Sequence, residues 1–465
     1  MRFPDEEFIQ AVTFTPNGDR ALAIGGDAIH VVDAVGAREL RRISMDGARP
    51  LQTMAVSPRG RWLAVGTSRT PPALSDRTEA AATVFAWPLS GDGIPRSLWA
   101  DGDMSIPALA FSPDEARIGS IGLVEHRSRG GPMFDGDIAL LDLATAVQQT
   151  LTFETDEVRQ GRYDVIPRAA AKELAFTHDG STIVAGMLGL RAFHSDSDRE
   201  SESFPQLVLY DATTLQRRRT VDLGGADFTA LATNADGSLL ATGHDRNTVR
   251  LWTTATARQR AFFLWPAVDR RDVLGSALYG GGITGLVFHP DGRRLAVARH
   301  DGVAVVDVVR GTRQEIAAAR DQGYSAVAFS PDGASLLYAS GTVQNTGFIE
   351  ARVSQWVTAT GKQGWTFELG TTEVPRLAFA PNGKWFAAAT SGGVSIHDAT
   401  TGLRLATLAI LGTDDWLVWT PDGRYAGSPA GIARLGAVRQ GRRAVPIAAV
   451  GRKLELPDLL AQVLP

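Results

Sequence analysis

Short apolar runs that lead directly into tight-turn residues recur along the whole chain. A representative stretch is "AVAFSPDG" (326–333), in which an apolar run ending in an aromatic residue precedes Pro-Asp-Gly. Variants of this phrase begin at residues 11, 53, 108, 173, 230, 285, 326, 376 and 416. Asp-Gly and Asn-Gly supply the positive φ angles that tight hairpins require. Each phrase therefore predicts a strand that turns at once into a second strand.

Two further apolar segments complete each repeat. A third strand follows, such as "LVLYDA" (207–212) or "VRLWTT" (249–254), and then a fourth, such as "GLRLATLAIL" (402–411). The last residue of the turn, Gly or Glu115, recurs every 40 to 65 residues, a spacing that indicates repeated supersecondary units. Four antiparallel strands in each unit predict an all-β propeller of eight four-stranded blades.

The ninth phrase, "DDWLVWTPDGRYAGSPAG" (414–431), has no complete set of strands after it. It begins either an incomplete ninth blade or an extra hairpin, and the hairpin is favoured because the first eight units already hold four strands each. We therefore expect a propeller over residues 1–411, and a C-terminal hairpin and tail over 412–465 packed on it.

The repeats resemble the WD-repeat (WD40-like) propellers. The resemblance rests on "FSPDG" and on third strands that end in Trp, as at Trp252, or in Asp, as at Asp307. No unit carries the Trp-Asp pair itself, and "TGHDRNTVRLW" (242–252) comes nearest to the family's His-Ser/Thr-Asp-Trp hydrogen-bond network. The resemblance implies the propeller fold, which packing between neighbouring blades stabilises even where that network is incomplete.

The C-terminal segment is similar to one found in bacterial WD-repeat proteins associated with caspase-like proteases. The ninth phrase and "RRAVPIAAVGRKLELPDLLAQVLP" (442–465) carry this likeness, although Ala426 stands where that pattern has Asp, and we expect no protease domain after Pro465. The likeness implies a partner, inhibitor, sensor or substrate in a caspase-like-protease signalling or defence system. The alternative is an apolar tail that covers the propeller.

The connections of each unit differ in length according to the side on which they emerge. In an antiparallel four-stranded blade, the first and third turns lie at one end, and the second turn and the link to the next blade lie at the other. The long connections all belong to the second group: 67–82, 123–136, 188–205 and 341–350 within blades, and 154–170 and 265–282 between them. Because insertions in repeats often mark the binding face, we expect this side to dock a protein. The alternative is that these connections are solvent-exposed and have no binding role.

The candidate protein-binding residues are the charged and aromatic ones in these connections. They are Arg69, Asp76, Arg77, His126, Arg127, Arg129, Asp156, Arg159, Tyr163, Arg191, His194, Asp196, Asp198, Arg199, Trp265, Arg270, Arg271 and Tyr279.

Composition removes several other function classes. The net charge of -4 provides no basic field for nucleic acid. The chain has no cysteine, so disulfides, thiolate metal sites and cysteine nucleophiles are excluded. The start "MRFPDEEFIQ" lacks the features of a signal peptide, and no run of about 18 apolar residues could span a bilayer. We expect a cytoplasmic protein that binds neither nucleic acid nor membrane.

Signals for catalysis are weak. The chain has no G-x-S-x-G motif, "GGGITG" (280–285) leads into a strand, and "HSDSD" (194–198) lacks the glycine and distal glutamate of a calcium loop. We therefore predict no catalytic residue, cofactor or metal ligand. The alternative is a propeller hydrolase or lyase with a site at the channel mouth, which the apolar inner strands, such as "GLVF" (285–288), disfavour.

Overall fold

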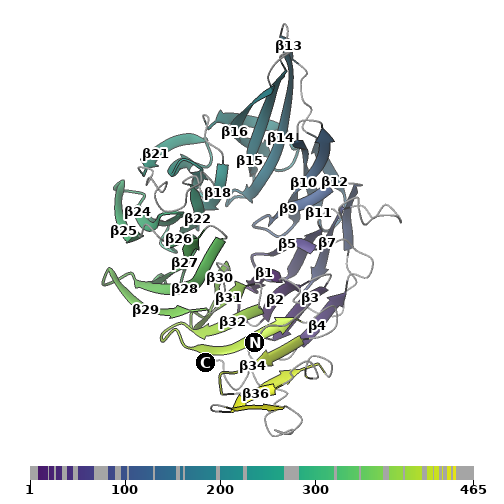
Figure 1. Cartoon of the computed structure of the whole chain (residues 1–465). Helices are drawn as coiled ribbons and strands as arrows, with labels where there is room; N and C mark the ends of the chain where they lie inside the picture. The colour runs from purple at the N-terminus through teal and green to yellow at the C-terminus, as the bar shows by residue number, and fades with distance from the viewer. Residues whose placement is uncertain are drawn as a thin grey trace. The chain divides into compact units, whose positions relative to one another are not determined.

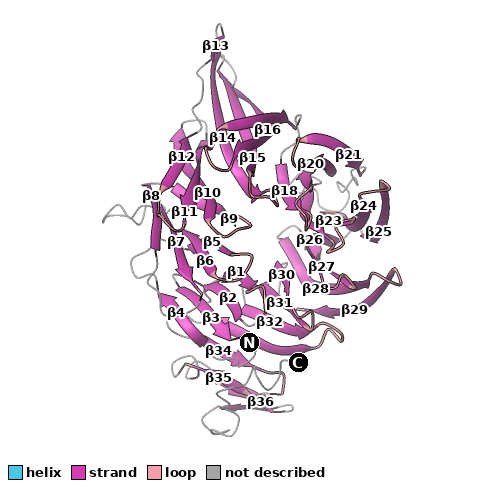
Figure 2. Cartoon of the chain, turned by 180° about the vertical axis from the view of Figure 1, so that it is seen from behind, coloured by secondary structure: helices cyan, strands magenta, loops and turns pink. Residues whose placement is uncertain are grey.

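The structure is a computed structural model that describes the residues in a series of ranges along the chain. These are 9–18, 20–25, 28–33, 39–44, 51–67, 82–89, 96–101, 104–128, 131–152, 158–160, 163–194, 199–223, 228–265, 282–318, 322–344, 347–369, 376–390, 393–410, 416–422, 424–428, 432, 437–440 and 443–446. The chain divides into two compact units, Met1–Leu51 with Gln322–Pro465, and Gln52–Asp321. Each unit is built from antiparallel sheets (Figures 1 and 2).

The first unit contains three large sheets and one small hairpin. The N-terminal sheet is β1 (Ile9–Phe14), β2 (Arg20–Gly25), β3 (Ala28–Asp33) and β4 (Glu39–Ser44). The next is β26 (Gln322–Phe329), β27 (Ser335–Gln344), β28 (Gly347–Val357) and β29 (Lys362–Glu368). The last is β30 (Arg376–Phe379), β31 (Trp385–Thr390), β32 (Gly393–Asp398), β33 (Arg404–Ile410), β34 (Trp416–Trp419) and β35 (Tyr425–Gly427). The hairpin is β36 (Ala437–Gln440) with β37 (Arg443–Pro446).

The second unit contains five sheets, each made of consecutive strands in chain order. They are β5 (Leu51–Val56), β6 (Trp62–Thr67), β7 (Ala82–Pro88) and β8 (Arg96–Asp101); then β9 (Met104–Phe111), β10 (Arg117–Ser128), β11 (Gly131–Asp142) and β12 (Gln148–Thr152). The middle sheet is β13 (Val158–Gln160), β14 (Tyr163–Phe176), β15 (Thr182–His194), β16 (Arg199–Asp211) and β17 (Arg217–Asp222). The last two are β18 (Phe228–Thr233), β19 (Leu239–His244), β20 (Thr248–Thr253) and β21 (Arg258–Leu264); and β22 (Ile283–Phe288), β23 (Arg294–Arg299), β24 (Gly302–Asp307) and β25 (Thr312–Ala318).

The expected all-β class is confirmed, but the prediction of eight four-stranded blades followed by a separate hairpin is wrong. Among the described sheets only six have four strands, while one has five and the last of the first unit has six. The ninth phrase supplies β34 and β35, and β34 pairs with β33 from Thr407↔Trp419 to Ile410↔Trp416. An isolated hairpin would leave an edge of unpaired backbone groups, and pairing with β33 satisfies one such edge. Counting phrases therefore overestimates the number of equal blades. The proposed boundary between residues 411 and 412 stays a prediction.

The recurring first turn is fixed by its own side chains. In 326–333 the Ser330 hydroxyl donates to Asp332 Oδ1 (2.6 Å) and accepts from the backbone N of Ser335 (2.9 Å). Gly333 then adopts a φ of 70°, which residues with a Cβ rarely adopt. Thr177, Asp179 and Gly180 repeat the same geometry.

First turns also contact the neighbouring sheet. A Cβ at Gly237 would lie 2.5 Å from the backbone N of His178, which belongs to the first turn of the preceding sheet. Glu115 is the exception to glycine: it holds a φ of 61° and accepts hydrogen bonds from Arg59 N and Arg61 Nε of the preceding sheet. The recurring shape of the phrase therefore serves packing between sheets as well as the turn itself.

Aspartates that end the third strands cap the third turns. Asp398 Oδ1 accepts from the backbone N of Thr400 (3.0 Å) and of Thr401 (2.7 Å), and Asp142 and Asp307 do the same in their turns. Such side-chain acceptors favour turns over continued strand. This capping gives the Asp at the ends of these strands a role in the turn that follows.

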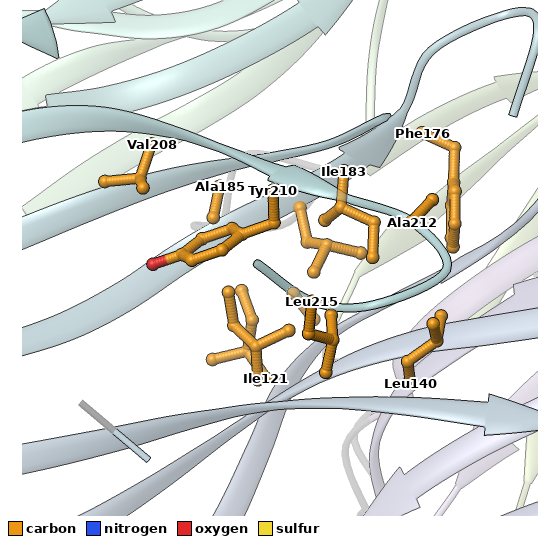
Figure 3. Close-up of a cluster of buried hydrophobic side chains, with 12 residues drawn as sticks. Ile121, Leu140, Phe176, Ile183, Ala185, Val208, Tyr210, Ala212 and Leu215 are labelled. Atoms are coloured by element: carbon orange, nitrogen blue, oxygen red, sulfur yellow. The ribbon is translucent and has the colours of Figure 1, made fainter. Parts of the chain in front are cut away.

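Apolar clusters between adjacent sheets form the core. In the second unit, Ile121 and Leu140 of the β9–β12 sheet pack against Phe176, Ile183 and Tyr210 of the next sheet (Figure 3). In the first unit, Phe14 of the N-terminal sheet meets Trp385 of the C-terminal sheet edge to face, with ring centroids 4.8 Å apart. The N-terminal sheet and the β30–β35 sheet therefore pack on each other.

The stretch 242–252 forms a buried hydrogen-bond chain. Trp252 Nε1 donates to Thr242 Oγ1 (2.9 Å), and Thr242 Oγ1 lies 3.1 Å from His244 Nε2. All three side chains are buried. The stretch 242–252, which is the most similar to the His-Ser/Thr-Asp-Trp network of the WD-repeat propellers, therefore forms polar contacts within its sheet.

No helix within the part of the chain that the structure describes is long and apolar enough to cross a membrane.

Candidate protein-binding surface

The connections between second and third strands vary most in length. These connections and the links to the next sheet lie at the same end of each sheet, which we call the second-turn end. At this end β10 and β11 pair as far as Ser128↔Gly131, β15 and β16 as far as His194↔Arg199, and β27 and β28 as far as Gln344↔Gly347. The first-turn end, which holds the first and third turns, has no comparable extension among the described residues.

The segments expected as long loops are therefore largely paired strands. Most of 123–136, 188–205 and 341–350 belongs to extended hairpins, and β13 and β14 occupy much of 154–170. The reason is that a long connection must satisfy its backbone groups, and two antiparallel segments do so by pairing with each other. Figure 1 shows β14, β15 and β16 reaching beyond the neighbouring sheet, with β13 at their tip. The segments 68–81 and 266–281 lie outside the described residues.

Seven of the candidate residues lie on these extended strands. They are His126 and Arg127 on β10, Arg159 on β13, Tyr163 on β14, Arg191 and His194 on β15, and Arg199 on β16. The register places His194 opposite Arg199, Tyr163 opposite Gln160, and Arg191 opposite Glu202. The backbone thus gathers five of the seven on one sheet, β13–β17.

Ten other candidates lie outside the described residues. They are Arg69, Asp76, Arg77, Arg129, Asp156, Asp196, Asp198, Arg270, Arg271 and Tyr279. Their part in binding stays a prediction.

Trp265 is the candidate with a described side chain, and it lies in a dense polar cluster. It follows β21, its backbone N donates to Asn247 O in the second turn of its own sheet (3.0 Å), and its ring is 3% exposed. Trp265 Nε1 donates to Glu315 Oε1 of β25 (2.7 Å). The indole therefore joins two neighbouring sheets at the second-turn end.

Two arginines from the next sheet lie against this indole. The guanidinium carbons of Arg299 and Arg313 are 4.9 and 5.1 Å from the ring centroid. A guanidinium near an aromatic face is attracted by the ring quadrupole, more strongly where water is excluded. Arg299 is 4% exposed, whereas Arg313 is exposed to solvent.

Carboxylates neutralise the buried arginine. Arg299 Nε donates to Asp301 Oδ1 (2.8 Å), and Arg299 Nη2 donates to Glu315 Oε2 (3.1 Å). A buried arginine without such partners would cost roughly several kcal/mol of folding free energy. These contacts therefore stabilise the cluster. Arg299 and Asp301 are buried on the inner side of the cluster, and Arg313 and the half-exposed Glu315 face solvent.

Arg299, Asp301, Arg313 and Glu315 are not among the residues that the sequence pattern singles out. Arg299 and Asp301 stand in the short second turn "ARHDG" (298–302), where no long insertion drew attention to them. A usable signal was present: an Arg and an Asp two residues apart at the end of an apolar strand, in the sheet following Trp265.

The cluster offers residue types that are suited to recognition. Tryptophan and arginine are the residue types most enriched at energetically dominant positions of protein interfaces. Within the described ranges, no group of three or more His, Cys, Asp or Glu could hold a metal ion.

The model of the family "WD domain, G-beta repeat" matches residues 219–253 and 274–306. These matches cover β18–β20, with the Thr242–His244–Trp252 contacts, and β22–β24 with Arg299 and Asp301. Together with sheets of consecutive antiparallel strands, they identify the fold as a WD40-like β-propeller. No curated protein matched the sequence.

Proposed function

We propose that this protein is a non-catalytic protein-binding scaffold or regulator whose partner docks on the second-turn end. The main support for this proposal is a contrast within the sheets. The first turns repeat one tight geometry, whereas β10–β11 and β15–β16 extend into long hairpins. WD40-like propellers commonly serve as protein-interaction scaffolds, which supports the proposal at this coarser level.

A caspase-like protease, or a component that it regulates in a bacterial signalling or defence system, is the partner we propose. This finer step rests on the likeness of 414–431 and 442–465 to segments of protease-associated propellers. The cytoplasmic location expected from the sequence remains a prediction.

The test removes both hairpins without touching the core. Gly122 faces Asp137 and Gly186 faces Leu207 in the register, so a two-residue turn can join each pair directly. Ile121 and Ala185, which pack in the core, are kept. Because the deletion also removes the β15 partners of Ile166 to Ala171 on β14, thermal unfolding of the shortened variant is measured first to show that the remaining sheets fold.

Binding is measured by affinity capture with mass spectrometry, followed by direct titration of the captured partner. The shortened variant should lose capture, whereas a control with Val147→Ser and Val309→Ser, both in third turns, should retain it. Equal capture by the shortened variant would overturn the proposal. Capture of a partner other than a caspase-like protease or its regulated component would overturn only the finer step.

A further inference from the structure

Exposed apolar side chains on the described residues single out one strand. Five large hydrophobic side chains are exposed, and three of them, Val147, Val309 and Leu403, lie in third turns. The other two, Phe262 and Leu264, are 46% and 53% exposed and lie two residues apart on β21. In a strand this spacing places both side chains on the same face.

β21 is the outermost strand of its sheet. Its pairing with β20 runs from Thr248↔Leu264 to Thr253↔Arg258, and the sheet order gives it no second partner among the described strands. Phe263, between the two exposed residues, is buried and packs toward Trp265 with ring centroids 6.4 Å apart. One face of β21 therefore belongs to the core. Its edge has no strand partner among the described residues, although the carbonyl of Leu264 at its end accepts from Arg313 Nη1 (2.7 Å).

The charged side chains within the β20–β21 hairpin are all positive, and Asp222 of β17 is a carboxylate that interacts electrostatically with Arg250. The segment 248–264 contains Arg250, Arg258 and Arg260 and no carboxylate, in a chain whose net charge is -4. Arg250 lies with its guanidinium carbon 5.7 Å from the Phe262 ring centroid, and its buried Nε has no hydrogen-bond partner. Arg219 of β17 adds a further cation by donating to the carbonyl of Thr256.

Two other outer strands differ in this respect. On β25, Glu315 accepts from Arg299, and on β29, Glu368 accepts from Arg352 (3.1 Å). These edges carry their own compensating charges, whereas the β20–β21 hairpin contains none.

We propose that the open edge of β21 binds an extended acidic segment of a partner protein. The segment adds to the sheet as a further strand, its apolar side chains contact Phe262 and Leu264, and its carboxylates pair with Arg250, Arg258 and Arg260. Main-chain pairing supplies affinity in this mode, and alternate side chains supply specificity. This surface is distinct from the hairpins of the proposed function.

The experiment selects short random peptides displayed on phage against the full chain, and then titrates the enriched peptides by fluorescence polarisation. We expect enriched sequences to alternate acidic and apolar residues. N-methylation of alternate peptide residues should abolish binding, because it removes the donors that a strand needs. The affinity should also fall as salt rises.

Substitutions locate the site. Phe262→Ser and Arg260→Glu should each weaken binding about tenfold or more, which corresponds to about 1.4 kcal/mol. Arg310→Glu, which reverses an 80% exposed charge in the third turn of the next sheet, is the control and should leave the affinity unchanged. Since both changed positions on β21 are exposed, the thermal unfolding temperature should stay near that of the wild type.

Three results would overturn the proposal: no enrichment of acidic sequences, equal affinity for the β21 variants, or self-association through β21 seen by sedimentation, which would make a second copy the occupant. The variant with both hairpins shortened should still bind the selected peptides. A loss of partner capture by that variant therefore tests only the proposed function, whereas a loss of peptide binding by the β21 variants tests only this inference.

Discussion

The two ends of the sheets differ in how closely the sequence determines them. At the first-turn end, Ser330 and Thr177 organise nearly identical turns, and glycines such as Gly237 pack against the preceding sheet. At the second-turn end, length and composition vary from the short turn at Arg299 to the long β15–β16 hairpin. The difference teaches that one repeated turn geometry constrains the first-turn end, whereas the second-turn end combines contacts between sheets, as at Trp265, with hairpins of very different length.

The largest loss of stability should come from adding a side chain where two first turns of adjacent sheets meet. Gly237→Ala places a Cβ 2.5 Å from the backbone N of His178, at a φ of 65°. We expect a loss of about 3 kcal/mol or more of unfolding free energy, since backbone strain and overpacking add. Urea unfolding measures it.

Gly311→Ala is the matched control. Gly311 has a φ of 71°, and nothing lies within 4 Å of the place that an added methyl group would occupy, so only the strain of about 1 kcal/mol should remain. Equal losses for the two variants would show that the first turns do not contribute through contact between sheets.

The buried His397 tests the same end in the first unit. Its ring stacks on Phe367 with centroids 4.2 Å apart, and its Nδ1 lies 3.1 Å from the third-turn carbonyl of Gly402. A carbonyl only accepts, so Nδ1 carries the proton and Nε2 accepts from the Ser395 hydroxyl (3.0 Å). Burial is the main cause that lowers the pKa of His397 from 6.5 to about 4.

Stability should therefore fall as the pH drops from about 6.5 to about 4, because the unfolded chain takes up a proton that the folded chain excludes. Across this window the loss from His397 amounts to about 3 kcal/mol. The variant His397→Gln removes this titration, so the difference in unfolding free energy between wild type and variant should change with pH. A constant difference would contradict the assignment.

A smaller loss of stability is expected at Glu115, which stands in place of the recurring glycine. Glu115→Ala leaves the donors Arg59 N and Arg61 Nε without their carboxylate, which should cost about 1 to 3 kcal/mol. Glu115→Gly loses the same contacts but relieves the strain at a φ of 61°, so it should be more stable than Glu115→Ala by about 1 kcal/mol. Thermal unfolding compares the two, and the reverse order would contradict the role given to the turn.

The sequence was sufficient for the parts of the fold that depend on local rules. Pro-Asp-Gly and Asn-Gly phrases located the first turns, and Asp398 or Asp307 marked the ends of third strands. The place of the ninth phrase could not be read in this way, because the choice between a separate hairpin and pairing with β33 depends on which edge is open in three dimensions. The extension of β15 and β16 was missed because pairing between two polar segments has no strong local signal.

The candidate site was predictable only in part. Trp265 was identified from its place in a long connection, but the contacts with Arg299, Arg313 and Glu315 come from the neighbouring sheet, 34 to 50 residues further along the chain. The open edge of β21 was likewise hidden, since "RQRAFFL" resembles any outer strand until exposure of Phe262 and Leu264 is known.

Hydrogen exchange of the free protein and of its complex with the captured partner tests the central claim most directly. The account predicts slower amide exchange on binding in 123–136 and 188–205, at the second-turn end, and unchanged exchange in the first turns at 112–116 and 330–334. Protection confined to the first turns, with none in the extended hairpins, would contradict it.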